Sequence, residues 1–168
     1  METLSEMDVR KGLPSASGIH RLALCPGSWN REKDLPGKTS EIALRGSLIH
    51  SYLEGKLKYG DAYKMKDLPE DGLALAASCE EVRDRVVIQF SEDTGGGQPE
   101  VYSIEDRLWL MDGFQEVASG AADVIYRNDD HFLILDYKTG PIAPDSSEKN
   151  YQLRSLAVML AEELDWNE

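Results

Sequence analysis

Apolar residues recur every three or four positions in several stretches of residues 1–92, and this spacing predicts a mainly helical N-terminal part. Short runs bounded by Pro and Gly predict a helix over residues 15–24, a longer one over 41–58 with Gly60 at its end, and a third over 73–90. The positions expected to face inward on the second of these helices are Ile42, Gly46, Ile49, Leu53 and Leu57. At Gly46, the missing side chain would permit close approach to a neighbouring layer.

The pattern changes over residues 100–138, where short runs of loosely alternating apolar and polar residues predict a meander of three strands. Turn sequences at Asp112-Gly113 and at Asn128-Asp129-Asp130 separate these strands. The last strand, HFLILDYK, is apolar on both faces before Asp136. Such a strand is typical of the centre of a sheet that is covered by helices.

A last helix is expected over residues 145–165. Asp145 would cap its first turn and Glu148 would reach back to complete a capping box. Helices before and after a strand-rich segment predict an α/β fold. We expect a single domain over residues 1–168, with a central mixed β-sheet flanked by helices. The positions expected to face inward on the last helix are Leu153, Leu156, Ala157, Leu160 and Leu164.

The register of the last hairpin brings two acids together. If the turn is centred between Asp129 and Asp130, Asp123 lies directly opposite Asp136, and opposed residues share one face of a sheet. Lys138 would point the same way as Asp136, because alternate residues of a strand share a face. The two carboxylates repel each other, so a cation is expected to compensate, and Mg²⁺ or Mn²⁺ is typical of carboxylate sites. A turn of odd length would instead place the two acids on opposite faces.

Composition limits the classes of function. The chain has 168 residues, and 31 acidic against 18 basic residues give a net charge of -13, which repels nucleic acid at long range. Any contact with DNA must therefore be local or assisted by a metal. Two cysteines, Cys25 and Cys79, are too few for a disulfide framework or a four-thiolate site. No signal sequence or long apolar span is present, so we expect a cytoplasmic protein without a membrane partner.

Several of these segments together resemble a known family. The segments are SASGIHRLALCPGSW from Ser15, GSLIH ending at His50, GAAD ending at Asp123, DYKTG from Asp136, and Tyr151-Gln152 on the last helix. Their order and spacing are similar to those of the RecB-type exonuclease branch of the PD-(D/E)XK nuclease superfamily, including its phage and prophage members. The resemblance runs over most of the chain. It implies a restriction-endonuclease-like core and metal-dependent hydrolysis of DNA, by an exonuclease of recombination, replication or repair in a bacterial or phage-infected cell.

The resemblance also implies roles for particular residues. Asp123 and Asp136 would ligate Mg²⁺ or Mn²⁺, the backbone carbonyl of Tyr137 would join them, and His50 would be a further ligand or would orient one. Lys138 would hold or polarise the attacking water.

Four further residues would support the site. Gln152, with Tyr151 beside it, would position Lys138 or the nucleic acid. Glu105, on the strand before Asp123, is a weaker candidate for metal or substrate contact and has a structural role as its alternative. Glu54, one helical turn after His50, could accept the second ring proton of that histidine or be an ordinary surface charge.

The sequence also departs from the family. Leu156 stands where relatives commonly have a tyrosine, which puts the contribution of the last helix in question. The late cysteines of iron–sulfur relatives are missing, so no cluster is expected and Cys25 is interpreted as a packed thiol. Relatives tend to continue with another strand, whereas this sequence ends at Glu168. The alternatives are a minimal version, a truncated product, or a subunit completed by a protein partner or a second copy. A noncatalytic binding or assembly module is the alternative function.

Overall fold

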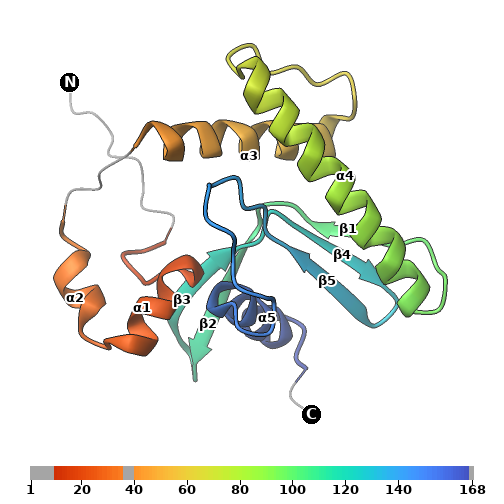
Figure 1. Ribbon diagram of the computed structural model, residues 1–168. Coiled ribbons are helices and arrows are strands. Elements are labelled where there is room, and N and C mark those ends of the chain that lie inside the picture. Colours follow the sequence, from red (N-terminus) through yellow and green to blue (C-terminus); the bar gives the residue numbers. More distant parts are fainter. Residues whose placement is uncertain (1–9, 36–39, 167–168) are drawn as a thin grey trace, which may run out of the picture. The chain divides into compact units, whose positions relative to one another are not determined.

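The computed structural model describes residues 10–35 and 40–166 (Figure 1). The chain divides into two compact units. The first unit comprises Met1–Gly37, Arg107–Ala121 and Asp145–Glu168, and the second comprises Lys38–Asp106 and Ala122–Pro144. The beginning of the expected helical N-terminal part, residues 1–9, lies outside the described residues. The single domain over residues 1–168 stays a prediction.

The first unit is a hairpin covered by helices. Strands β2 (Arg107–Asp112) and β3 (Gln115–Ala121) pair antiparallel around the expected Asp112-Gly113 turn, where Gly113 has a φ of 61°. The short helices η1 (Ala16–Gly18), α1 (Ile19–Leu24) and α2 (Ser28–Glu32) precede them, and α5 (Tyr151–Glu163) packs on β2 and η1. The buried apolar residues of this unit are Ala16, Leu108, Ala118, Leu156, Met159 and Leu160.

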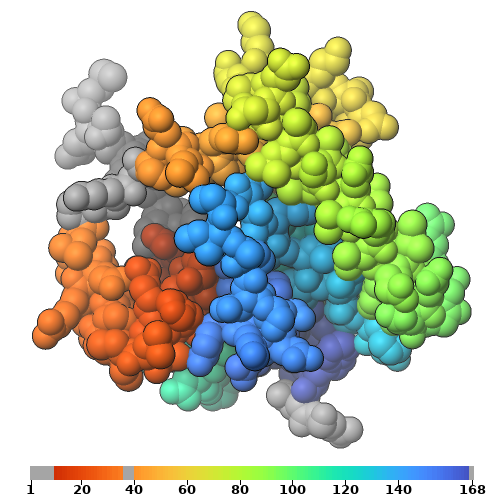
Figure 2. Space-filling model, in the orientation of Figure 1, coloured from red at the N-terminus to blue at the C-terminus, as the bar shows by residue number. Residues whose placement is uncertain are grey.

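The second unit combines two long helices with a small sheet. Helix α3 (Glu41–Tyr59) packs against α4 (Glu70–Asp93), and the strands β1 (Glu100–Ser103), β4 (Val124–Asn128) and β5 (His131–Leu135) form an antiparallel sheet in the order β1-β4-β5. Figure 2 shows part of α4 at the surface. The side chains of Val82 and Ile88 on this helix are exposed. A core of Ile49, Leu53, Leu68 and Ala76 holds the two helices together.

The mixed α/β composition is confirmed, but the single mixed sheet is not. The described strands form two small sheets whose pairings are all antiparallel. The three long strands that the sequence predicts are divided into five, because the chain turns at Glu105 and Asp106 and again at Ala122 and Asp123. The last strand is also not central: β5 lies at an edge of the described sheet, and β4 is the buried middle strand.

The long N-terminal helices agree closely with the hydrophobic pattern. Helix α3 begins after Ser40, whose hydroxyl oxygen accepts a hydrogen bond from the N–H of Ala43 at 3.2 Å, and it ends at Gly60, where φ is 76°. Ile49 and Leu53 are fully buried as expected, whereas Ile42 is 62% exposed. The pattern did not predict α2, which is too short to show a period, and α4 extends beyond the expected residues 73–90 at both ends.

The expected start of the last helix is wrong. Helix α5 begins at Tyr151, and the side chain of Asn150 accepts hydrogen bonds from the N–H groups of Gln152 and Leu153. Asn150 thus does the capping that the sequence assigned to Asp145. Ala157, expected to face inward, is exposed. Met159 is buried instead, because it lies three residues after the buried Leu156 and so on the same face of the helix. No helix within residues 10–35 and 40–166 is both long and apolar enough to cross a membrane.

Candidate functional site

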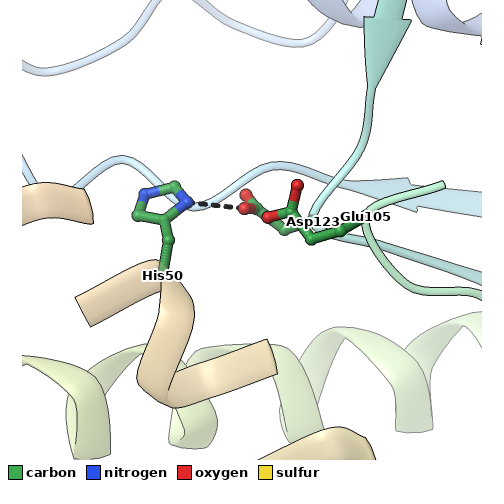
Figure 3. Close-up of side chains that lie close together, drawn as sticks. All are labelled: His50, Glu105 and Asp123. Carbon is green, nitrogen blue, oxygen red and sulfur yellow. Dashed lines mark hydrogen bonds and ion pairs between the residues drawn. The ribbon is translucent and has the colours of Figure 1, made fainter. Parts of the chain in front are cut away.

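The centre of the candidate site is a contact between His50 and Asp123, both in the second unit. His50 lies half-buried on α3, and its Nδ1 donates a hydrogen bond to Oδ1 of Asp123 at 2.5 Å (Figure 3). The Asp123 side chain is only 7% exposed, and its second oxygen accepts a hydrogen bond from the backbone N–H of Tyr137. A buried carboxylate requires such partners, since an unpaired charge away from water is costly.

The hairpin register places Asp123 as predicted. Val124 pairs with Leu135 at the end of the β4–β5 ladder, and the two-residue turn at Asp129-Asp130 fixes this register. Asp123 and Asp136 occupy the next position on each side. At this position the side chain of Asp123 accepts the hydrogen bond of the Tyr137 N–H, where a continued ladder would use a backbone carbonyl.

Glu105 completes a cluster of three possible metal ligands. It lies between β1 and β2 with a φ of 58°, which is uncommon for a residue other than glycine and is frequently associated with functional sites. Its N–H donates a hydrogen bond to the carbonyl of Ala122 at 3.2 Å, which holds this turn beside Asp123. One ligand atom from each of His50, Glu105 and Asp123 lies within 4.8 Å of the others (Figure 3).

The charges in this cluster shift its protonation equilibria. Burial raises the pKa of Glu105 from 4.5 to about 7, and the neighbouring Asp123 contributes in the same direction. The hydrogen bond to Asp123 raises the pKa of His50, against the opposing effect of burial. Without a metal, the cluster therefore holds protons more strongly than these groups ordinarily do, and a divalent cation would displace them.

Asp136 and Lys138 form an ion pair beside this cluster. The side chain of Asp136 is 8% exposed and that of Lys138 is 37% exposed. Burial raises the pKa of Asp136, Lys138 lowers it, and the charges of Asp123 and His50 also act on it, which shows that these groups are close enough to interact. Asp136 is thus held by Lys138, whereas Glu105 joins Asp123 in the ligand cluster, and the role of Asp136 as a metal ligand stays a prediction.

Tyr137 and Gly46 hold the elements of the site together. The ring of Tyr137 packs edge-on against that of His50, with 6.1 Å between ring centres, and burial raises the pKa of its hydroxyl to about 12. A Cβ atom on Gly46 would lie 3.2 Å from Oγ1 of Thr139. The predicted close approach at Gly46 is therefore present, and it brings α3 against the segment that follows Lys138.

Comparison with known proteins identifies a family. A family model described as "Protein of unknown function (DUF2800)" matches residues 12–166. The chain belongs to the DUF2800 family. No curated protein and no solved structure matches it. The matched region of this DUF2800 protein includes the whole cluster as well as Asp136 and Lys138.

The other predicted residues of the DUF2800 protein have separate outcomes. Glu54 pairs with Lys58 at 2.7 Å instead of with His50; both lie one helical turn from Glu54, but Nδ1 of His50 is bonded to Asp123. Gln152 and Tyr151 lie in the first turn of α5, in the first unit, so their catalytic roles stay predictions. The Tyr137 carbonyl as a ligand also stays a prediction. Cys25, expected to be packed, is an exposed thiol.

The three clustered residues are chemically suited to a divalent cation. Two carboxylates and one imidazole offer oxygen and nitrogen donors, and the combination fits Mn²⁺ or Mg²⁺. In the part of the chain that the structure describes, His50, Glu105 and Asp123 are the one group of at least three acidic, histidine or cysteine side chains with this spacing. The sequence assigned Glu105 only a minor role. The signal available was the charged pair Glu105-Asp106, which interrupts an apolar run.

Proposed function

We propose that this DUF2800 protein is a metal-dependent DNA nuclease with a restriction-endonuclease-like core, of the RecB-type branch of the PD-(D/E)XK superfamily. The observation that carries the proposal is the convergence of His50, Glu105 and Asp123 within 4.8 Å, beside the Asp136–Lys138 ion pair. The order of these residues along the chain agrees with the resemblance in the sequence. An exonuclease acting in phage or bacterial recombination, replication or repair is the role that this resemblance favours.

The chain's own residues would divide the work as follows. Asp123, Glu105 and His50 would hold Mg²⁺ or Mn²⁺, and Tyr137 would fix the orientation of Asp123 through its N–H. The bound ion would lower the pKa of a water and stabilise negative charge on the phosphate.

Lys138 would orient the attacking water and offset the charge that develops on the phosphate. Its ion pair with the buried Asp136 limits where the ammonium group can lie. Asp136 would accordingly act as a positioning residue for Lys138, and it would also add negative charge near the cation.

A noncatalytic binding or assembly module is the second candidate. It is favoured by the direct pairing of His50 with Asp123 and of Asp136 with Lys138, because these contacts satisfy the charges without any metal. The net charge of -13 also opposes a broad DNA-binding surface. The two candidates differ in whether a cation can displace the protons of the cluster and support hydrolysis.

A nuclease assay separates these candidates. Linear and circular DNA are incubated with Mg²⁺, Mn²⁺ or EDTA and the native protein, D123N, D136A or K138A. Matched controls are D130N, in the exposed turn of the same hairpin, and K64A, on an exposed loop of the same unit. Metal-dependent cleavage that is lost in the three site variants and kept in both controls supports the nuclease, and sparing of circles shows a need for ends. A folded native protein that cleaves nothing and binds no Mn²⁺ supports the module.

A further inference from the structure

A polar cavity lies in the first unit of the chain, and the proposed nuclease centre does not account for it. Its volume is about 260 Å³, and a single water needs only about 10–15 Å³ of such space. We call it the arginine pocket. The lining residues used below are Arg10, Ser15, Ser17, Arg107, Gly120 and Gln152.

The charge of the arginine pocket is opposite to that of the chain. The whole sequence has 31 acidic and 18 basic residues, yet two arginines and no acidic residue stand among the described residues that line this cavity. Two hydroxyl groups and one amide add further hydrogen-bonding groups. A polar cavity with this composition favours an anion that accepts several hydrogen bonds.

The positions of these groups are fixed by the surrounding structure. Nη1 of Arg107 donates a hydrogen bond to the hydroxyl oxygen of the fully buried Ser119 at 3.0 Å, which leaves the rest of the guanidinium for other partners. The N–H of Ser119 donates to the carbonyl of Pro14 at 2.9 Å, so the segment before η1 is tied to β3. Ser15 lies on that segment and Ser17 lies in η1, with 3.0 Å between their hydroxyl oxygens.

Gly120 allows the segment to approach the strand closely. A Cβ atom at this position would lie 2.6 Å from Cβ of Ala16 and 2.8 Å from Cδ2 of Leu156. Real Cβ atoms do not approach so closely, so any side chain here would push η1 and its serines away from Arg107. The glycine therefore maintains the arrangement of serine and arginine.

We propose that the arginine pocket binds a phosphate group. Guanidinium groups match the geometry of phosphate oxygens, and the serine hydroxyls can donate to the oxygens that remain. The volume leaves room for part of the molecule to which the phosphate is attached. That phosphate could belong to free phosphate or to the terminus of a nucleic acid, and the two sources share the same recognition chemistry.

Binding is measured by titration calorimetry without divalent cations, so that the result does not depend on nuclease activity. The probes are inorganic phosphate and a single-stranded oligonucleotide that carries a phosphate at the 5′ end, at the 3′ end or at neither end. The variants are R107Q, R10Q and S17A, and the matched control is R31Q, an exposed arginine of the same unit. Because Arg10 is exposed, R10Q tests the pocket without removing the hydrogen bond to Ser119.

The expected result is binding that weakens about tenfold or more in R107Q and R10Q, and less in S17A, with R31Q like the native protein. If one end-phosphorylated oligonucleotide binds more tightly than the unphosphorylated one, the source is a nucleic-acid terminus. If inorganic phosphate binds and the three oligonucleotides bind equally, the source is free phosphate. The proposal is overturned if no probe binds, or if binding is the same in R107Q, R10Q and R31Q.

Discussion

The backbone N–H of Tyr137 donates a hydrogen bond to the side chain of Asp123, at the position where the backbone pairing of β4 and β5 has stopped. One carboxylate thereby ends the hairpin, contacts His50 and contributes a possible metal ligand. Stability and function consequently depend on the same side chain.

Replacing Asp123 with alanine is expected to destabilise the protein by about 1–3 kcal/mol, because the N–H of Tyr137 loses its acceptor in a partly buried position. The free energy of unfolding from urea titration measures this loss. D130A, in the exposed turn of the same hairpin, is the control and is expected to change stability by less than about 0.5 kcal/mol. Equal stability of the two variants would show that the contact of Asp123 with Tyr137 contributes nothing.

Stability without metal is expected to depend on pH through Glu105. Its pKa in the folded protein is about 7, against an ordinary value of 4.5, so the folded state favours the protonated acid. The stability from this group is present in full below pH 4.5 and is lost as the pH rises to about 7.

The variant E105Q keeps a neutral side chain at every pH and tests this dependence. Urea titrations at pH 5, 6, 7 and 8 are expected to show that its stability, relative to the native protein, increases with pH. The raised pKa of His50 acts in the same direction; its main cause, the hydrogen bond to Asp123, is kept in E105Q, whereas the smaller contribution from the charge of Glu105 is lost with it. A constant difference across this range would contradict the raised pKa.

Added Mn²⁺ is expected to raise the thermal midpoint, because an ion that binds the folded state alone stabilises it by about 2.7 kcal/mol at a concentration of 100 Kd. The shift should be larger at pH 8 than at pH 5.5, since the ion must displace the proton of Glu105. Scanning calorimetry with and without Mn²⁺ measures both effects. D123N should lose most of the shift; an unchanged shift in that variant would place the bound ion elsewhere.

Gly120 is expected to tolerate no larger residue. G120A should lower the free energy of unfolding by about 1–3 kcal/mol, because the new methyl group overlaps with Ala16 and Leu156. The matched control is G27A in the same unit, where a Cβ atom meets nothing within 4 Å and φ is -81°. Chemical denaturation of both variants compares them, and a G120A protein as stable as G27A would mean that η1 is not held against β3 as described.

The capping of α5 gives another comparison. N150A should cost about 1 kcal/mol of stability, because two N–H groups of the first turn lose their acceptor, while D145A should cost close to nothing. Urea midpoints of the two variants provide the measurement. A larger loss of stability in D145A than in N150A would show instead that Asp145 caps the helix.

The hairpin and the capping box show how far local patterns determine this structure. The β4–β5 register follows from a two-residue turn and could be predicted, and with it the position of Asp123 and Asp136 just beyond the last pair of the ladder. Asp145 and Glu148 satisfy a capping pattern as well as Asn150 does, and local sequence alone does not decide between them.

Glu105 and Ile42 could not be assigned for a different reason. Glu105 reaches the site through a left-handed turn that no glycine or asparagine marks in the sequence. Ile42 fits an inward stripe, but whether a neighbour covers that end of α3 depends on tertiary packing. The nuclease interpretation and its fold family remain proposals, because the matched family is described as one of unknown function.

Glu105 and Asp123 stand beside the two crossings at which the backbone passes between the units. The chain leaves the second unit after Asp106 and returns to it at Ala122, and the hydrogen bond from Glu105 to Ala122 joins the outgoing and returning segments. The stretch Arg107–Ala121 is therefore an excursion whose two ends are fastened to each other inside the second unit, and the spacing of Glu105 and Asp123 is set within that unit.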